Sequence, residues 1–159
     1  MTRIPIRELG GKKGEEVSIS GWVDVRRDQG KMIFLDIRDA SGKVQSVVLP
    51  NQTEALEVAK TLRTEWVVEV SGKVNERPEK NKSEGENGDI EVEIFSIKIL
   101  NEAETPAFDI GADGREIGDE NRLKYRYLDL RRPRMQKNIM MRHKVAKFVR
   151  DFLDKENFL

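Results

Sequence analysis

The fold is decided by the stretch Ile33-Phe34-Leu35-Asp36-Ile37-Arg38-Asp39, which opens with an aliphatic residue at every second position. A period of two is typical of a β-strand that packs one face on a core and turns the other toward water. The parity that buries Ile33, Leu35 and Ile37 places Phe34 on the opposite face, beside Asp36. The sequence therefore predicts a strand with an aromatic ring on its outward side.

Strand-like patterns lie on both sides of this stretch. Before it, alternate residues from Val17 to Val25 keep one parity, and after it Val44 to Leu49 form a β-branched run. Between the three runs lie Asp28-Gln29-Gly30-Lys31 and Asp39-Ala40-Ser41-Gly42, whose Asp and Gly residues suit tight turns. Three successive antiparallel strands are predicted.

The pattern then changes to a helical period over residues 52–64 and returns to strands. A fourth strand is expected from Trp66 to Val74 and a fifth from Ile90 to Ile99, with a very polar loop between them. The order βββαββ is that of the OB-fold, a mostly β, five-stranded, partly open barrel whose second and third strands and two loops face oligonucleotides or oligosaccharides. We assign residues 1–101 to this barrel.

The remainder of the chain differs in composition. Residues 102–133 begin with an acidic, Gly- and Pro-containing segment and are predicted to form a linker or hinge. From Arg122 to Arg150 basic residues dominate, and the apolar spacing of Val145, Phe148 and Phe152 predicts an amphipathic helix within residues 134–159. We expect sequence beyond this stretch to cover its apolar side.

Composition excludes several function classes. Lys+Arg and Asp+Glu both number 29, so attraction to nucleic acid must come from local charge rather than from net charge. The chain has no cysteine and no apolar run long enough to span a membrane, which favours a cytoplasmic protein without a membrane partner. The only histidine, His143, has no partner set around it, so we expect no catalytic residue and no metal site.

Groups that suit single-stranded RNA surround Phe34 in the predicted barrel. An exposed ring on the second strand can stack on a base, guanidinium groups bind phosphates or base edges, and amides pair with Watson–Crick edges. Two alternatives without an RNA-binding role stay open: the ring packs under a loop, or the polar groups only contact solvent. The candidates of this kind are Arg26, Arg27, Phe34, Gln45, Arg77, Asn81 and Lys82.

Several motifs resemble one family. Gly21-Trp22-Val23, Arg26-Arg27-Asp28 and the stretch from Ile33 to Asp39, together with Arg126-Tyr127-Leu128-Asp129-Leu130-Arg131-Arg132-Pro133, closely resemble aspartyl-tRNA synthetases of the bacterial type. The first pieces are shared with lysyl and asparaginyl relatives, and the last is specific to the aspartyl member. The likeness implies an anticodon-binding OB-fold, a hinge, and in residues 134–159 the first helix of a class II catalytic domain truncated before its catalytic motifs.

The resemblance also implies roles. The full-length enzyme would be a homodimer that joins aspartate to tRNA with ATP and Mg²⁺, whereas these 159 residues would bind no cofactor and catalyse nothing. Phe34 would stack on the central anticodon uridine, Gln45 and Arg27 would read or brace that base, and Arg77, Asn81 and Glu91 would lie around the anticodon. Gln29 and Lys82 are candidates for distinguishing aspartate tRNA from asparagine tRNA. The competing hypotheses are a free-standing single-strand binder and a protein-docking module; tRNA, not DNA, is the expected partner.

Overall fold

The computed structural model describes residues 3–111 and 116–158. The chain divides into two compact units, Met1–Thr105 and Pro106–Leu159. Residues 112–115, inside the predicted linker, and Leu159, at the end of the predicted helical segment, lie outside the described residues. The domain boundaries expected at residues 101 and 133 stay predictions.

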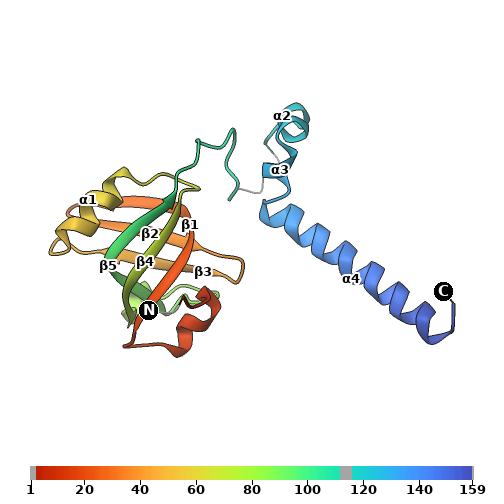
Figure 1. The fold of residues 1–159 in the computed structure, drawn as a ribbon, viewed down its shortest axis with the longest axis horizontal. Coiled ribbons are helices and arrows are strands. Elements are labelled where there is room, and N and C mark those ends of the chain that lie inside the picture. The colour runs from red at the N-terminus through yellow and green to blue at the C-terminus, as the bar shows by residue number, and fades with distance from the viewer. Residues whose placement is uncertain (1–2, 112–115, 159) are drawn as a thin grey trace. The chain divides into compact units, whose positions relative to one another are not determined.

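The first unit is a closed five-stranded barrel with the strand order β1-β2-β3-β5-β4 (Figure 1). β3 and β5 pair in parallel, and the other four pairings are antiparallel. The predicted OB-fold and its βββαββ order are therefore confirmed. The elements are the 3-10 turn η1 (Ile6–Gly11), β1 (Glu16–Gln29), β2 (Met32–Arg38), β3 (Lys43–Val48), α1 (Thr53–Thr61), β4 (Val67–Glu76), η2 (Glu79–Asn81) and β5 (Ile90–Asn101).

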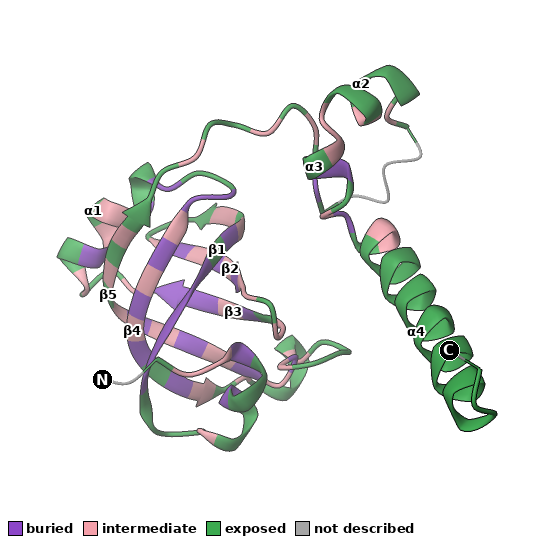
Figure 2. Cartoon of the chain, turned by 45° about the vertical axis from the view of Figure 1, so that its right-hand side comes forward, coloured by how far each residue is buried: buried purple, intermediate pink, exposed green. Residues whose placement is uncertain are grey.

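Alternate side chains of the strands fill the barrel, as the period of two requires. In β2 the buried residues are Ile33, Leu35 and Ile37, while the residues between them are only partly covered. Ile6 and Leu9 of η1 and Ala55 and Ala59 of α1 add to the same core. The buried segments therefore run along the barrel strands in Figure 2.

Two glycines allow strands to approach each other more closely than a side chain would permit. A Cβ atom on Gly21 of β1 would lie 2.3 Å from the carbonyl oxygen of Arg38, and one on Gly72 of β4 would lie 2.2 Å from that of Glu93. Glycine inside a strand commonly marks such a close backbone approach or a bend at a barrel corner. Close packing of β1 against β2 thus requires glycine at the first position of the Gly-Trp-Val motif.

Asp39 ties the turn after β2 to the start of η1. Its Oδ1 accepts hydrogen bonds from the backbone N–H groups of Ser41 (2.6 Å) and Gly42 (3.0 Å), and its Oδ2 accepts one from the N–H of Ile6 (3.0 Å). Burial raises the pKa of Asp39, but the hydrogen bonds from Ser41, Ile6 and Gly42 outweigh burial, so the pKa lies below its usual value. Ionised Asp39 is therefore a structural group.

A β-bulge in β1 corrects one prediction. The register with β2 shifts between Val23, which pairs with Ile37, and Val25, which pairs with Asp36. Val23 is buried, whereas Val25 is 38% exposed, so the expectation that both face the core was wrong. The cause is Asp24, the extra residue of the bulge, because one unpaired residue reverses the facing of everything after it.

In the part of the second unit that the structure describes there are three helices: α2 (Asp119–Lys124), α3 (Arg126–Asp129) and α4 (Pro133–Lys155). Two of them lie within residues 102–133, where sequence composition predicts a linker. Asp129 explains this difference, because its buried carboxylate accepts hydrogen bonds from Arg126 (2.6 Å), from Nε of Arg132 (2.9 Å) and from Arg122 (3.3 Å). Burial raises the pKa of Asp129, but the hydrogen bonds and positive charges of Arg132 and Arg122 lower it by more. The pKa of Asp129 therefore lies below its usual value.

α4 agrees with the predicted amphipathic helix. Pro133 occupies its first turn, where a proline costs no hydrogen bond. Its apolar side chains, among them Val145, Phe148 and Phe152, are exposed in this structure. Within residues 3–111 and 116–158, no helix combines the length and the apolar character that a membrane span requires.

Candidate nucleic-acid interface

Strand pairing gathers four of the predicted site residues on the outside of the barrel. In the register of β1 and β2 Arg27 lies opposite Phe34, and in that of β2 and β3 Asp36 lies opposite Gln45. Ser46 of β3 pairs with Val92 of β5, which brings Gln45 and Glu91, one residue earlier on each strand, to the same surface. We call the surface made by Arg27, Phe34, Asp36, Gln45 and Glu91 the outer face.

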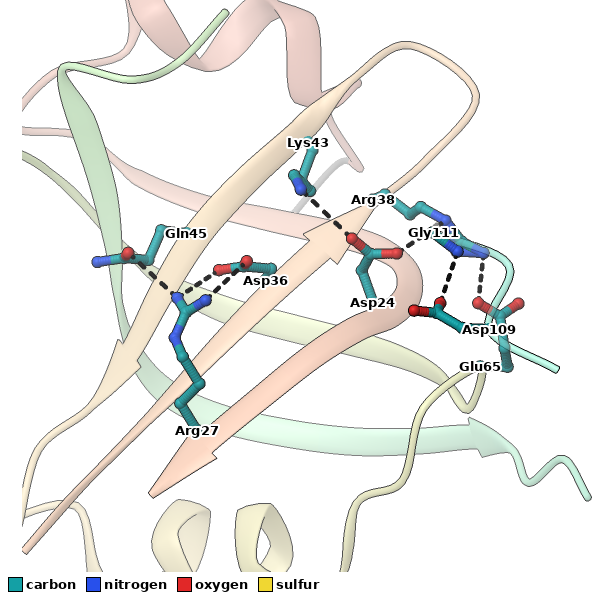
Figure 3. A network of polar contacts seen from close by, with 9 residues as sticks. All are labelled: Asp24, Arg27, Asp36, Arg38, Lys43, Gln45, Glu65, Asp109 and Gly111. Atoms are coloured by element: carbon teal, nitrogen blue, oxygen red, sulfur yellow. Dashed lines mark hydrogen bonds and ion pairs between the residues drawn. The ribbon is translucent and has the colours of Figure 1, made fainter. Parts of the chain in front are cut away.

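A chain of polar contacts crosses the outer face, and Figure 3 shows its part formed by Arg27, Asp36 and Gln45. Arg27 donates to both carboxylate oxygens of Asp36, at 3.1 and 2.8 Å, and its Nη2 also donates to Oε1 of Gln45 at 3.3 Å. Nε2 of Gln45 in turn donates to Oε2 of Glu91 at 3.3 Å. The two-pronged pairing of a guanidinium with a carboxylate is the geometry that fixes an arginine most firmly.

These contacts fix the orientation of the Gln45 amide. A guanidinium only donates and a carboxylate only accepts, so the amide oxygen must face Arg27 and the amide nitrogen must face Glu91. The reverse orientation would set two donors against each other at one end and two acceptors at the other. Gln45 is only half-buried, so its second N–H and its remaining lone pair can pair with a ligand.

Phe34 lies on the outer face, as the alternation of β2 predicts. It is half-buried, whereas its chain neighbours Ile33 and Leu35 are buried in the core. Val47, directly opposite on β3, is only 5% exposed although it does not belong to the barrel core cluster. Directly opposed side chains on one face lie close enough to pack, so we expect Phe34 to pack against Val47, and the residue as a whole stays partly exposed.

Arg26 lies apart from this group. Because of the bulge it pairs with Leu35 and so shares the core-facing side of the sheet, at the end of the barrel. Its Nη1 donates to the carbonyl oxygens of Lys60 (2.6 Å) and Leu62 (3.1 Å), which lie at the C-terminal end of α1, and its Nη2 pairs with Asp28 (2.7 Å). These contacts give Arg26 a structural role at the end of α1.

The loop between β4 and β5 holds three further candidates. Arg77 is half-buried just beyond β4 and donates to the carbonyl oxygen of Gly88 at 3.5 Å. Asn81 is exposed in η2, and Lys82 pairs with Glu76 at 3.0 Å and more closely with Glu79, contacts that raise the pKa of Lys82. No hydrogen bond between described residues joins Asn81 or Lys82 to the outer face.

Sequence reasoning missed two features of the site. The first is Asp36, the carboxylate that holds Arg27. Because Asp36 lies two residues after Phe34 in the same strand, the alternation of β2 could have placed it on the outer face. The second is the ion pair between Arg38 and Glu65, which no sequence pattern indicates because the two residues are far apart in sequence.

Gln29, at the end of β1, is exposed and pairs with Met32 in the turn.

The described residues offer no cation site. Among residues 3–111 and 116–158, no group of three or more His, Cys, Asp or Glu side chains is arranged to hold a metal ion. The resemblance assigns magnesium and ATP to the full-length enzyme and not to these residues, so no chemical step is assigned to them here.

The comparison with known families decides the classification. The model of the OB-fold nucleic acid binding domain matches residues 17–100, more than half of the chain. The chain belongs to this family. The model of class II tRNA synthetases (D, K and N) matches residues 118–159 of the same OB-fold chain.

Individual relatives agree with both matches. The chain is 51% identical over 155 residues to the aspartate–tRNA(Asp/Asn) ligase of Natranaerobius thermophilus, covering 96% of this chain and 26% of that protein. It is 48% identical to the aspartate–tRNA ligase of Thermosipho melanesiensis, covering 91% of this chain and 24% of that protein. The resemblance to aspartyl-tRNA synthetases is thereby confirmed, and the chain spans about a quarter of the length of these relatives.

A solved structure extends the likeness to three dimensions. The asparaginyl-tRNA synthetase of Pyrococcus horikoshii, complexed with asparaginyl-adenylate, superimposes with a TM-score of 0.79 at 28% identity. The match covers 98% of this OB-fold chain and 35% of that protein.

Proposed function

We propose that the outer face binds the anticodon loop of a tRNA, with Phe34 as a stacking platform and Gln45 as the reader of the central base. The observation that supports this most directly is the amide of Gln45, oriented by Arg27 and Glu91 two strand positions away from a partly exposed aromatic residue. Stacking on an aromatic side chain and pairing with the Watson–Crick edge are the two elements of single-stranded RNA recognition.

The fixed amide supports discrimination between uridine and cytidine, and the resemblance to aspartyl-tRNA synthetases supports uridine as the preferred base. Uracil offers an N3–H donor beside carbonyl acceptors, whereas cytosine offers an N3 acceptor beside an amino donor. An amide that can turn freely satisfies either base, but one held between Arg27 and Glu91 presents its oxygen and nitrogen in one order only. A base with the opposite pattern leaves polar groups unpaired at about 1–3 kcal/mol each.

The whole protein is proposed to ligate aspartate to tRNA, consuming ATP with Mg²⁺, as a homodimer in the cytoplasm. The names of the relatives support the ligase activity, and the chain spans about a quarter of their length. The cofactors, the homodimer and the cytoplasmic location are proposed from the family resemblance. Within the whole protein the present residues would select the tRNA and contribute no catalytic group.

The central base provides the test. A short anticodon hairpin with a central uridine, and the same hairpin with cytidine there, are titrated against the chain by fluorescence anisotropy. We expect the uridine hairpin to bind roughly tenfold more tightly, and Gln45→Ala to reduce that ratio more than it reduces overall affinity. Gln136→Ala, at an exposed position on α4, is the matched control and should change neither quantity.

The outcomes separate the competing functions. Equal binding of both hairpins and of an unrelated single strand would favour a free-standing single-strand binder over anticodon recognition. A protein-docking module would show no salt-dependent affinity for any RNA. An unchanged uridine preference in Gln45→Ala would remove Gln45 from the reading role.

Discrimination between aspartate and asparagine tRNAs is a narrower proposal. Gln29 ends β1 in the exposed turn before β2, and Asn81 and Lys82 lie in or beside η2, so we propose that these two loops contact the third anticodon base. Exchanging Gln29 in the complete enzyme and comparing the charging of both tRNAs tests it. Equal effects on the two tRNAs would rule Gln29 out as a discriminating residue.

A further inference from the structure

The bulge in β1 determines which arginine faces the RNA-binding surface. Arg27 lies four residues after Val23, and an uninterrupted strand would give it the core-facing parity of Val23. The extra residue, Asp24, reverses that parity, so Arg27 lies opposite Phe34 and Arg26 faces the other way. A shift of one residue at this point would exchange the two arginines.

Backbone hydrogen bonds attach the bulge to the loop between α1 and β4. The N–H of Glu65 donates to the carbonyl oxygen of Val23 at 2.8 Å, and the N–H of Val23 donates to that of Trp66 at 2.9 Å. Glu65 has a positive φ of 71°, unusual for a residue with a side chain, and is only 6% exposed. Such a conformation persists where the surroundings enforce it.

Charged side chains hold both partners of this attachment. The carboxylate of Glu65 accepts a short hydrogen bond from Nη2 of Arg38, and Nε of the same arginine lies 3.4 Å from Oδ1 of Asp24. Lys43 approaches the other oxygen of Asp24, also at 3.4 Å. Figure 3 shows Arg38 between the carboxylates of Asp24 and Glu65. We call Asp24, Arg38 and Glu65 the bulge clamp.

We propose that Asp24 and Glu65 are positioning residues for RNA recognition, because the bulge clamp holds the backbone shift that keeps Arg27 on the outer face. Neither carboxylate lies in the polar chain formed by Arg27, Asp36, Gln45 and Glu91. Their effect on RNA therefore passes through Arg27, and through it to the orientation of the Gln45 amide. This inference rests on the proposed function of the outer face.

The test combines isosteric variants of the full 159-residue chain with a hairpin whose central anticodon base is uridine. Glu65→Gln and Asp24→Asn should each weaken binding by about threefold or more, and in an Arg27→Ala background each should change affinity by less than about twofold. Glu15→Gln removes an ion pair with Lys12 outside the clamp and should leave affinity unchanged. Asp24→Asn serves as the second variant should Glu65→Gln lower stability too far.

A measurement without RNA separates this inference from the proposed function. In the free chain, Glu65→Gln and Asp24→Asn should move the NMR resonance of the Arg27 side-chain Nε–Hε group, and Glu15→Gln should not. An unmoved resonance, or an equal loss of affinity with and without Arg27, would overturn the positioning role. A moved resonance combined with full RNA binding by Arg27→Ala would instead support the clamp and count against Arg27 as an RNA contact.

Discussion

Replacement of Phe34 by alanine tests two roles of this ring, stacking on a base and packing against the barrel surface. Stacking of a base on an aromatic side chain contributes about 1–3 kcal/mol, which corresponds to a loss of roughly fivefold to 150-fold in affinity. We also expect the ring to pack against Val47, so its removal has a cost to the fold. Because Phe34 is half-buried, that cost should lie near 1–2 kcal/mol, below the roughly 3–5 kcal/mol of a core phenylalanine.

The assay measures both quantities on the same samples. Hairpin affinity should fall at least about fivefold at 25 °C, while Tm falls by about 5–10 °C for a barrel of this size. Two variants serve as controls. Phe34→Leu keeps an apolar cover over Val47 but has no flat face, so it should lose affinity with less loss of stability; Phe34→Tyr keeps the ring and should retain both.

Two results would refute the reasoning. Wild-type affinity in Phe34→Leu would show that no base stacks on the ring. A stability loss of more than about 3 kcal/mol in Phe34→Ala would show that the ring is a core element and not a surface platform.

Further predictions concern the barrel itself. Gly21→Ala should destabilise the chain by about 2–4 kcal/mol in urea unfolding, since its Cβ would collide with a β2 carbonyl, whereas Gly11→Ala, with open space around it, should not. Ser46→Ala should leave stability unchanged or raise it by up to about 1 kcal/mol, because the buried hydroxyl has no partner among the described residues; a clear loss would reveal one. The lowered pKa of Asp39 means that its ionised form stabilises the fold above about pH 4 and that this contribution is lost as the pH falls through the folded-state pKa. Asp39→Asn should therefore be less stable than wild type at pH 7, and the difference should narrow in acid; a difference independent of pH would contradict this.

Periodicity was sufficient for the architecture. The alternation around Phe34, the helical spacing of Ala55 and Ala59 and the Asp- and Gly-containing turns predicted the order of strands and helix, because each pattern reflects only which face of a local element is buried. The same parity placed Phe34 and Asp36 on the outer face. These features could be predicted because no distant residue changes them.

The remainder depended on contacts between distant residues. Nothing near Asp24 marks a bulge, since the shift is held by Arg38 and Glu65 from other parts of the chain, so the facing of Val25 was predicted wrongly. The bonds of Arg26 to the carbonyl groups at the end of α1 could not be predicted because those partners are more than thirty residues away, and its RNA contact stays a prediction. Composition gave no signal for α2 and α3 within residues 102–133, because the contacts of these helices converge on the buried carboxylate of Asp129.

Closure of the barrel limits how the chain can associate with other molecules. β1 pairs with both β2 and β4, and β3 with both β2 and β5, so each strand of the barrel has a neighbour on either side, although β3 and β5 are joined at only two residue pairs. An extended peptide, or a strand of an unfolded copy, can therefore pair only with the strand stretches that lie outside these ladders. Recognition by the outer face therefore rests mainly on side chains, and selectivity can change by substitution at a few outward positions while the hydrogen-bonded frame stays intact.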